Sequence, residues 1–226
     1  MLYTHAGPEI AVASTKAFLA QITAAYLLGL YLAQLNKKLF SGQIKDILAD
    51  LGAIPGKIEE ILAAKDQVKE LARSMADATS VLFLGRNVGY PVAMEGALKL
   101  KELAYIHAEG FAAGELKHGP IALIDDGQPV FVVMPSPLDR HSLHAKVVSN
   151  IQEVRARGAR TFAVAERGDA AVRGQAEVVF EVPETQPMLM PLLTTVPLQI
   201  FALELATAKG YDVDQPRNLA KSVTVE

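Results

Sequence analysis

Cysteine and tryptophan are both absent from the 226 residues. Without cysteine the chain can form no disulfide and offers no thiolate nucleophile, and it lacks the thiolate ligands on which most structural zinc sites depend. Basic runs are also absent and the net charge is −3, so the chain has no electrostatic footprint for nucleic acid or for an anionic membrane surface. We therefore expect no nucleic-acid partner and no membrane partner.

The first ten residues, MLYTHAGPEI, lack the basic region and continuous apolar core of a secretory signal. Together with the absence of cysteine, this favours a cytoplasmic location. What the chain does have is a globular composition: 50% of its residues are hydrophobic and 21% are charged. A chain of this length can bury a substantial core.

Residues 17–35, AFLAQITAAYLLGLYLAQL, form the most apolar stretch and are nearly long enough to span a bilayer. Polar residues interrupt the stretch, lysines flank it, and we expect no second span of this kind. We predict a protein-covered helix. Because such a helix needs neighbours on nearly every side, we expect its cover in a preceding N-terminal portion or in a second subunit.

The rest of the chain predicts an α/β fold. Residues 41–75 have the period of amphipathic helices, with a break expected near Ile54-Pro55-Gly56. Unalternating runs rich in valine and phenylalanine then predict strands that are buried on both faces of a parallel sheet covered by helices. Strands are expected at 80–85, 129–134, 161–165 and 176–182, and helices at about 90–106, 140–157 and 190–208.

Three charged residues share one stripe of the predicted helix 90–106. Glu95, Lys99 and Glu102 are spaced four and then three residues apart, which places the lysine between two carboxylates. Spacing alone favours a solvated ion-pair ladder. The functional alternative is that Glu102, beside a cation, stays ionised and abstracts a proton from carbon next to a carbonyl.

The histidines carry weaker signals. His118 lies in the tight turn GELKHGP and could pass protons, although a loop histidine is more often structural. His107 is expected to be a packed or capping residue at a helix end. His141 and His144 have helical spacing but lack a third ligand, so we predict no metal site. Lys221, near the C-terminus, has the features of a mobile surface lysine.

Several motifs together carry a family resemblance: THAGPEIAVASTKAF, EGALKLKELAYIHAEGFAAGELKHGPIALID and DQPRNLAKSVTVE. Over essentially all of its length the chain resembles the C-terminal part of the isomerizing glutamine:fructose-6-phosphate aminotransferases, or glucosamine-6-phosphate synthases. The resemblance implies a three-layer αβα sandwich of the sugar-isomerase (SIS) type with a parallel five-stranded sheet. It divides the chain into the end of a first SIS domain (1–38), a helical connection (39–79), a second SIS domain (80–208) and an active-site tail (209–226).

The resemblance also implies a reaction: fructose 6-phosphate and glutamine-derived ammonia become glucosamine 6-phosphate, in hexosamine biosynthesis, without metal or organic cofactor. Glu102 would take the proton from C1 of the sugar and return it at C2. Lys99 would stabilise the charge that develops on the enediol-like intermediate.

Other roles are implied by position. His118 would assist opening of the sugar ring and would come from a neighbouring subunit, which implies a homodimer. Lys221 would approach the carbonyl carbon and can form a Schiff base. Three further residues match positions that line the sugar: Val12, Ser14 and Ala220.

The chain also departs from that family. Without cysteine it has no glutaminase nucleophile, and no S-x-S-G-x-T pattern for the sugar phosphate occurs. A glutaminase domain and a first SIS half would therefore have to complete it. We expect the isolated chain to have isomerase activity near zero and weak affinity for sugar phosphates.

Two other functions remain open at this point. One is an SIS-type sugar-phosphate deglycase or deaminase, against which the ending DQPRNLAKSVTVE argues. The other is a noncatalytic sugar-phosphate-binding module, against which the joint presence of Glu102, His118 and Lys221 argues.

Overall fold

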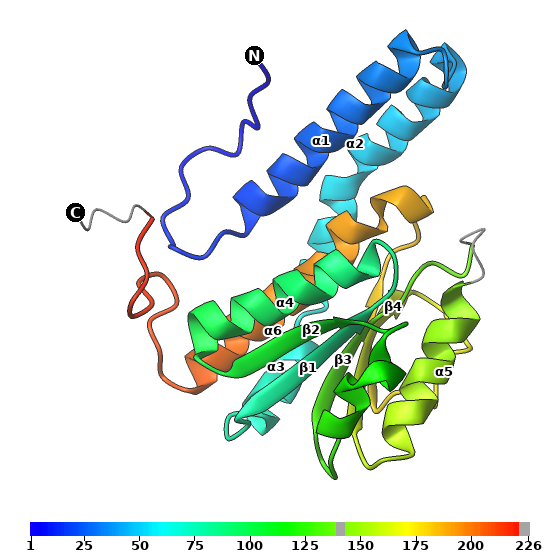
Figure 1. The fold of residues 1–226 in the computed structure, drawn as a ribbon. Helices are drawn as coiled ribbons and strands as arrows, with labels where there is room; N and C mark the ends of the chain where they lie inside the picture. Colours follow the sequence, from blue (N-terminus) through cyan, green and yellow to red (C-terminus); the bar gives the residue numbers. More distant parts are fainter. Residues whose placement is uncertain (139–142, 222–226) are drawn as a thin grey trace.

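A computed structural model describes residues 1–138 and 143–221. Its centre is a five-stranded sheet whose strands all run parallel, in the order β2-β1-β3-β4-β5 (Figure 1). This confirms the predicted α/β class with a parallel sheet. The strands are β1 (Ser80–Gly85), β2 (His107–Ala112), β3 (Pro129–Val133), β4 (Arg160–Glu166) and β5 (Val178–Val182).

Helices cover both faces of this sheet and make the three-layer arrangement (Figure 1). The α-helices are α1 (Lys16–Leu35), α2 (Ser41–Ala63), α3 (Asp66–Ser74), α4 (Gly89–Ala104), α5 (Leu143–Arg155) and α6 (Met190–Ala208). Short 3-10 helices are η1 (Leu116–His118), η2 (Pro120–Leu123) and η3 (Pro187–Leu189). One core unites α3, α4 and α6 with one face of the sheet, and a second core joins α5 to the other face.

The strands are apolar without alternation because both of their faces are buried. In β1, Phe83 belongs to the core under α4 and α6, whereas its neighbours Leu82 and Leu84 belong to the core under α5. The ring of Phe131 in β3 lies 4.5 Å from the ring of Phe201 in α6. Such aromatic contacts fix the distance between helix and sheet.

The residue pattern predicted four of the five strands and missed β2. This strand lies at the sheet edge, and within residues 1–138 and 143–221 it pairs only with β1. Its alternate side chains face solvent, so no continuous apolar run marks it. The expectation for His107 is wrong for the same reason: His107 begins β2, and its side chain is 79% exposed.

The predicted break at Pro55 is also wrong, because α2 runs unbroken from Ser41 to Ala63. A proline inside a helix removes one backbone hydrogen bond and crowds the preceding turn. Pro55 is exposed, so its ring meets solvent and not the core. The helical connection turns instead at residues 64 and 65, between α2 and α3.

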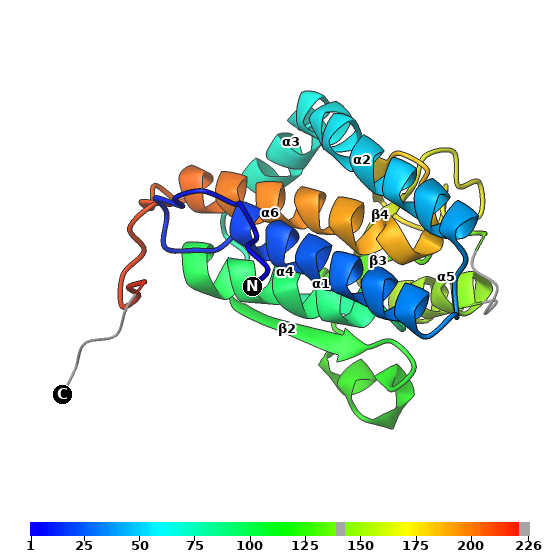
Figure 2. The same ribbon diagram turned by 90° about the horizontal axis from the view of Figure 1, so that it is seen from above.

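Among the described residues two helices, and not one, are long and apolar enough to cross a membrane: Lys16–Leu35 and Pro187–Ala208. The second passes this test because it is the core helix, with 78% of its apolar window buried. The first forms α1, which pairs with α2 in a helical hairpin that projects from the α/β unit (Figure 1) and is drawn over α4 and α6 when seen from above (Figure 2). Among the described residues α1 is covered on one side only, and Leu28, Tyr31 and Leu35 stay exposed.

Candidate active site

The charged stripe lies in the last turns of α4, near the amino edge of the sheet. Lys99 Nζ lies 2.5 Å from Glu102 Oε2 and 3.4 Å from Glu95 Oε1. Helical spacing of four and three residues makes both contacts possible from one backbone segment. The predicted arrangement of a lysine between two carboxylates is therefore present.

This stripe is not the solvated ladder that spacing favoured. The side chain of Lys99 is only 2% exposed, because it lies beneath the surface between α4 and its neighbours. An ammonium group at such depth is tolerated when paired carboxylates offset its lost hydration. The two glutamates therefore compensate the buried charge of Lys99 and do not form a solvated surface ion pair.

Glu102 is the member of the stripe that reaches solvent, since its side chain is 22% exposed. Its Oε2 accepts the hydrogen bond from Lys99, while no hydrogen bond to its Oε1 is made by any other described residue. One oxygen is thus fixed and the other is available to a ligand. A carboxylate held in this way can take a proton from a bound molecule.

Glu95 sits deeper and behaves differently. Burial raises the pKa of its carboxyl group, with a further contribution from Glu102, and the opposing charge of Lys99 does not cancel this rise. Its Oε1 lies near Lys99 without hydrogen-bond geometry and has no other partner among the described residues. The sequence placed Glu95 in the stripe but gave no sign that it would be the buried member.

The C-terminal tail closes against this end of α4. Tyr105 follows the helix in the left-handed region, at φ 54°, and turns its ring toward the tail. Its hydroxyl oxygen accepts a hydrogen bond of 2.7 Å from the backbone N–H of Arg217, whose guanidinium lies 4.2 Å from the ring centroid. The tail is therefore held one turn beyond Glu102 by a residue that the sequence pattern did not single out.

The N-terminal segment meets the same tail. The N–H of Val12 donates to the carbonyl of Asp214 at 3.1 Å. Lys221 Nζ lies 4.0 Å from Glu9 Oε2, and the other oxygen of Glu9 accepts from the N–H and hydroxyl of Thr15. Burial acts to raise the pKa of Glu9, but hydrogen bonds from Thr15 and Ala17, together with the charge of Lys221, outweigh it and lower the pKa.

An adjoining cavity of about 390 Å³ shows how these segments converge. Its lining includes Ala13 from the N-terminal segment, Leu103 from α4 and Val213 from the tail. Val12 and Ser14 flank Ala13 and are half-buried. Segments far apart in the sequence are thus brought to one corner, near Glu102.

Lys221 approaches the N-terminal segment at Glu9 and forms no ion pair with Glu102 in the part of the chain that the structure describes, and Ala220 precedes it in the tail. Both are exposed at the end of the described tail, and the only carboxylate near Lys221 among the described residues is that of Glu9. The structure therefore brings together Lys99 and Glu102 in direct contact, and Val12, Ser14, Ala220 and Lys221 as neighbouring segments.

His118 lies at the opposite end of the strands, where their carboxyl ends are. It ends η1, the short helix that follows β2, and its side chain is exposed. Because α4 runs back from the carboxyl ends of the strands to their amino ends, the 14 residues from Gly89 to Glu102 span about 20 Å of helix and place Glu102 at the other end of the strands from His118. Within one chain, His118 and Glu102 are not part of one site.

The other histidines form no metal centre in the described residues. His144 Nε2 lies 2.5 Å from Asp169 Oδ2 in a largely buried pair, and no group of three possible ligands occurs in residues 1–138 and 143–221. His141 lies outside the described residues.

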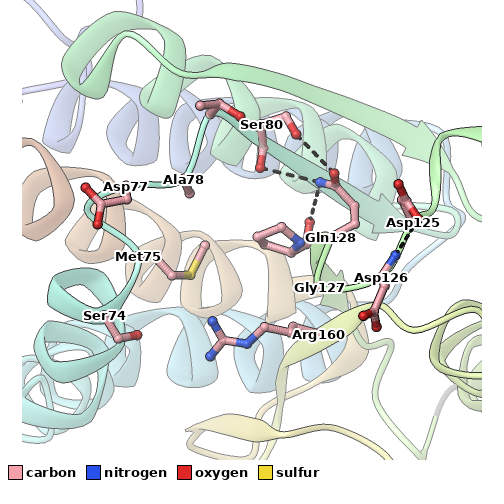
Figure 3. Close-up of a pocket in the computed structure, with 12 residues that line it drawn as sticks. Ser74, Met75, Asp77, Ala78, Ser80, Asp125, Asp126, Gly127, Gln128 and Arg160 are labelled. Atoms are coloured by element: carbon pink, nitrogen blue, oxygen red, sulfur yellow. Dashed lines mark hydrogen bonds between the residues drawn. The ribbon is translucent and has the colours of Figure 1, made fainter.

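A further cavity, of about 380 Å³, lies at the amino ends of β1, β3 and β4 (Figure 3). Asp77, Asp126 and Arg160 surround it, and Gln128 bonds Ser80 across its wall. None of the predicted site residues lines it. The guanidinium of Arg160 is already paired with Glu177, at 2.6 Å.

Comparison with known sequences gives one consistent result. The SIS domain family matches residues 74–209. Proteins named glutamine–fructose-6-phosphate aminotransferase [isomerizing] match the whole chain: that of Corynebacterium efficiens is 69% identical over 225 residues, and that of Corynebacterium diphtheriae 70% identical over 226. The Mycobacterium tuberculosis protein of this name is 61% identical over 226 residues. The chain spans 36% of the length of each of these curated relatives.

Solved structures agree with the sequence comparison. The C-terminal domain of glucosamine-fructose-6-phosphate aminotransferase from Francisella tularensis is 38% identical, with a TM-score of 0.85, over 92% of this chain and 58% of that one. The tagatose-6-phosphate ketose/aldose isomerase of Escherichia coli, 20% identical, has a TM-score of 0.71 over 93% of this chain and 55% of that one. The second likeness concerns the fold alone.

Proposed function

The chain belongs to the SIS domain family and matches the C-terminal isomerase region of the isomerizing glutamine–fructose-6-phosphate aminotransferases; on this premise we propose that it carries the sugar-isomerase chemistry of such an enzyme. The substrate would be fructose 6-phosphate, aminated with ammonia from glutamine, and the product glucosamine 6-phosphate. The observation that carries the proposal is Glu102, with one oxygen fixed by buried Lys99 and the other available.

In this proposal Glu102 moves one proton. Its available oxygen takes the proton from C1 of the sugar imine. The C1–H electron pair forms the C1=C2 double bond, and the C2=N pair moves onto nitrogen, which gains a proton. The same carboxylic acid then returns its proton to C2, while the C1 hydroxyl loses its proton and becomes the aldehyde, so that the carboxylate is regenerated and the protons balance. Lys99 keeps Glu102 oriented and places a positive charge near the intermediate, where negative charge develops.

The tail and the N-terminal segment would complete the sugar site. Lys221 is proposed to approach the sugar carbonyl from the tail, and Val12, Ser14 and Ala220 to line the sugar. Their support is the corner at which the tail, the N-terminal segment and the end of α4 meet. In the chain alone the ammonium group of Lys221 lies 4.0 Å from Glu9, so this side chain would have to move toward the sugar when substrate binds.

His118 would enter the site from a second copy of the chain. The span of about 20 Å along α4 places it at the other end of the strands from Glu102 of its own chain, whereas its exposed position on η1 suits contact with another subunit. A homodimer, a cytoplasmic location and divisions of the chain near residues 38, 79 and 208 are parts of the same proposal.

A chimera tests the proposal directly. The matched region of the Corynebacterium efficiens relative is replaced by this chain, with which it shares 69% identity, and glucosamine 6-phosphate formation is assayed. We expect the chimera to be active and its Glu102→Gln variant to lose about a hundredfold or more in kcat, with little change in KM for fructose 6-phosphate, since a general base is removed. Lys101→Gln, at an exposed position of the same helix, is the matched control.

Two outcomes would contradict the proposal. Full activity of the Glu102→Gln chimera would remove the proton-transfer role. Sugar-phosphate binding by an inactive chimera, unchanged by that variant, would favour the noncatalytic binding module. The 226-residue chain alone is expected to show turnover near zero, because it has neither a glutaminase nucleophile nor the phosphate loop of a first SIS half.

A further inference from the structure

A second polar cavity, of about 260 Å³, lies at the carboxyl edge of the sheet, far from Glu102. The end of β1, the loop after β2 and one side of α5 surround it. Its lining consists of Arg86, Gly114, Lys117, Lys146, Ser149, Asn150 and Glu153. None of these residues belongs to the stripe on α4 or to the tail.

The charges of this cavity are unequal, with three cations against one carboxylate. Lys117 Nζ lies 2.9 Å from Glu153 Oε1. Burial acts to raise the pKa of Glu153, but hydrogen bonds from Lys117, Asn150 and Ser149 outweigh it and lower the pKa, so Glu153 is ionised at neutral pH. Across the part of the chain that the structure describes, Arg86 and Lys146 have no carboxylate partner. Two positive charges are thus in excess.

Arg86 is held in place by a buried side chain. Its Nε donates to Asn150 Oδ1 at 3.2 Å, and Asn150 is only 4% exposed. Asn150 in turn donates to Glu153 Oε2 at 3.2 Å. Gly114 leaves room for the guanidinium, because a Cβ at this position would lie 3.1 Å from Arg86 Nη1. The terminal nitrogens of Arg86 are therefore oriented without being used by Asn150.

We propose that this cavity binds a phosphate group, either inorganic phosphate or the phosphate of a small ester. A guanidinium donates two parallel hydrogen bonds to such an oxyanion, and lysine ammonium groups suit its remaining oxygens. Arg86, Lys117 and Lys146 supply this set from three separate elements, while the hydroxyl of Ser149 donates to Glu153. The inference concerns binding alone and does not depend on the proposed reaction.

The site has a structural consequence for the loop that carries His118. Gly114 and Lys117 belong to that loop, whereas Lys146 and Ser149 belong to α5. An anion bound between them ties the loop to the helix. Phosphate binding in the cavity should then slow hydrogen exchange of the His118 backbone amide with solvent. This amide donates to the carbonyl of Glu115 at 2.9 Å.

The test measures binding to the 226-residue chain by calorimetry and by backbone amide shifts, at constant ionic strength. Inorganic phosphate, glucose 6-phosphate and uncharged glucose are titrated separately. Saturable shifts at Gly114, Lys117 and Ser149 with phosphate or with glucose 6-phosphate, and none with glucose, are expected. Tighter binding of the ester would identify an ester phosphate as the ligand, and tighter binding of phosphate the free ion.

Variants decide whether the named residues form the site. Arg86→Gln and Lys146→Gln should each weaken binding about tenfold, because each removes a charge-assisted hydrogen bond. Glu153→Gln should strengthen it, since the one opposing charge is lost. Lys45→Gln on exposed α2 should leave it unchanged.

Lys146 is exposed, so its replacement is expected to leave the fold intact. Weaker binding by this variant therefore cannot be explained by unfolding. Absence of saturation, or equal weakening by the Lys45 and Lys146 variants, would overturn the proposal.

Discussion

The two edges of the sheet handle charge in opposite ways. At the amino edge, Lys99 is buried and each of its charge partners, Glu95 and Glu102, is supplied by the same helix. At the carboxyl edge, Arg86 and Lys146 border an open cavity, and the nearby carboxylate of Glu153 is engaged by Lys117. At the amino ends of the strands the buried cation is paired within its own helix, whereas at the carboxyl ends two cations have no carboxylate partner among the described residues.

This difference separates two tasks that charged residues perform. A buried, matched array has a single arrangement, so it can hold one carboxylate oxygen at a fixed place for proton transfer. An open cavity with excess positive charge keeps its attraction for a ligand from solution. Variants at the two edges should therefore differ both in their cost to stability and in their effect on binding.

The largest expected effect comes from the matched array. Lys99→Met should lower the free energy of unfolding by about 3–5 kcal/mol, because it leaves two carboxylates without the buried cation between them. Urea denaturation at neutral pH measures this loss. Lys101→Met, at an exposed position of the same helix, should cost far less. Equal stability of the two variants would show that Lys99 does not stabilise the fold through its contacts with Glu95 and Glu102.

A smaller loss is expected at the carboxyl edge. Asn150→Ala removes the buried amide that bonds Arg86 and Glu153, and it should cost about 1–3 kcal/mol in urea denaturation. Ser149→Ala, at the exposed neighbouring position, should cost much less. If Asn150→Ala proved neutral, Arg86 would not be held in place by the buried side chain.

The sequence predicted the fold well where burial was complete. Runs such as SVLFLG indicated strands covered on both faces, and β1, β3, β4 and β5 formed there. The prediction failed at β2, because a strand with solvent-facing side chains has a residue pattern like that of a loop. It also failed at Pro55, where helix propensity predicted a break that α2 does not have. Edge position and exposure, which decide both cases, are properties of the folded chain.

The candidate site was predictable in part. Spacing placed Lys99 between two glutamates, but it could not show that Lys99 is buried, and this burial is what distinguishes a fixed array from a solvated ladder. The meeting of the tail with α4 depends on Tyr105 in a left-handed conformation, which no periodic pattern indicates. The cavity at Arg86 gathers residues from three elements and gave no local signal.

The tail contact should have a modest and local effect. Tyr105→Phe removes the acceptor of the Arg217 amide but keeps the ring under the guanidinium, so about 1 kcal/mol of local stability should be lost. Hydrogen exchange at the Arg217 amide should become faster, while global stability changes little. Tyr31→Phe, on the exposed side of α1, is the matched control. Unchanged exchange at Arg217 would mean that other contacts hold the tail.

The smallest effect concerns the pH dependence of stability at the matched array. Because burial raises the pKa of Glu95 above its ordinary value of 4.5, the folded chain holds a proton at this group more tightly than the unfolded chain does. The contribution of this group is therefore complete below 4.5 and declines as the pH rises through the folded-state pKa.

Glu95→Gln, which cannot ionise, should remove that decline. Urea denaturation from about pH 4 to about pH 8 should show the parent chain losing stability relative to this variant as the pH increases. Glu59→Gln, at an exposed position on α2, should run parallel to the parent. A parent chain that gained stability relative to Glu95→Gln over this range would mean that Lys99 holds the Glu95 carboxylate ionised, and the amino edge would then carry a full ion triad and not a partly protonated one.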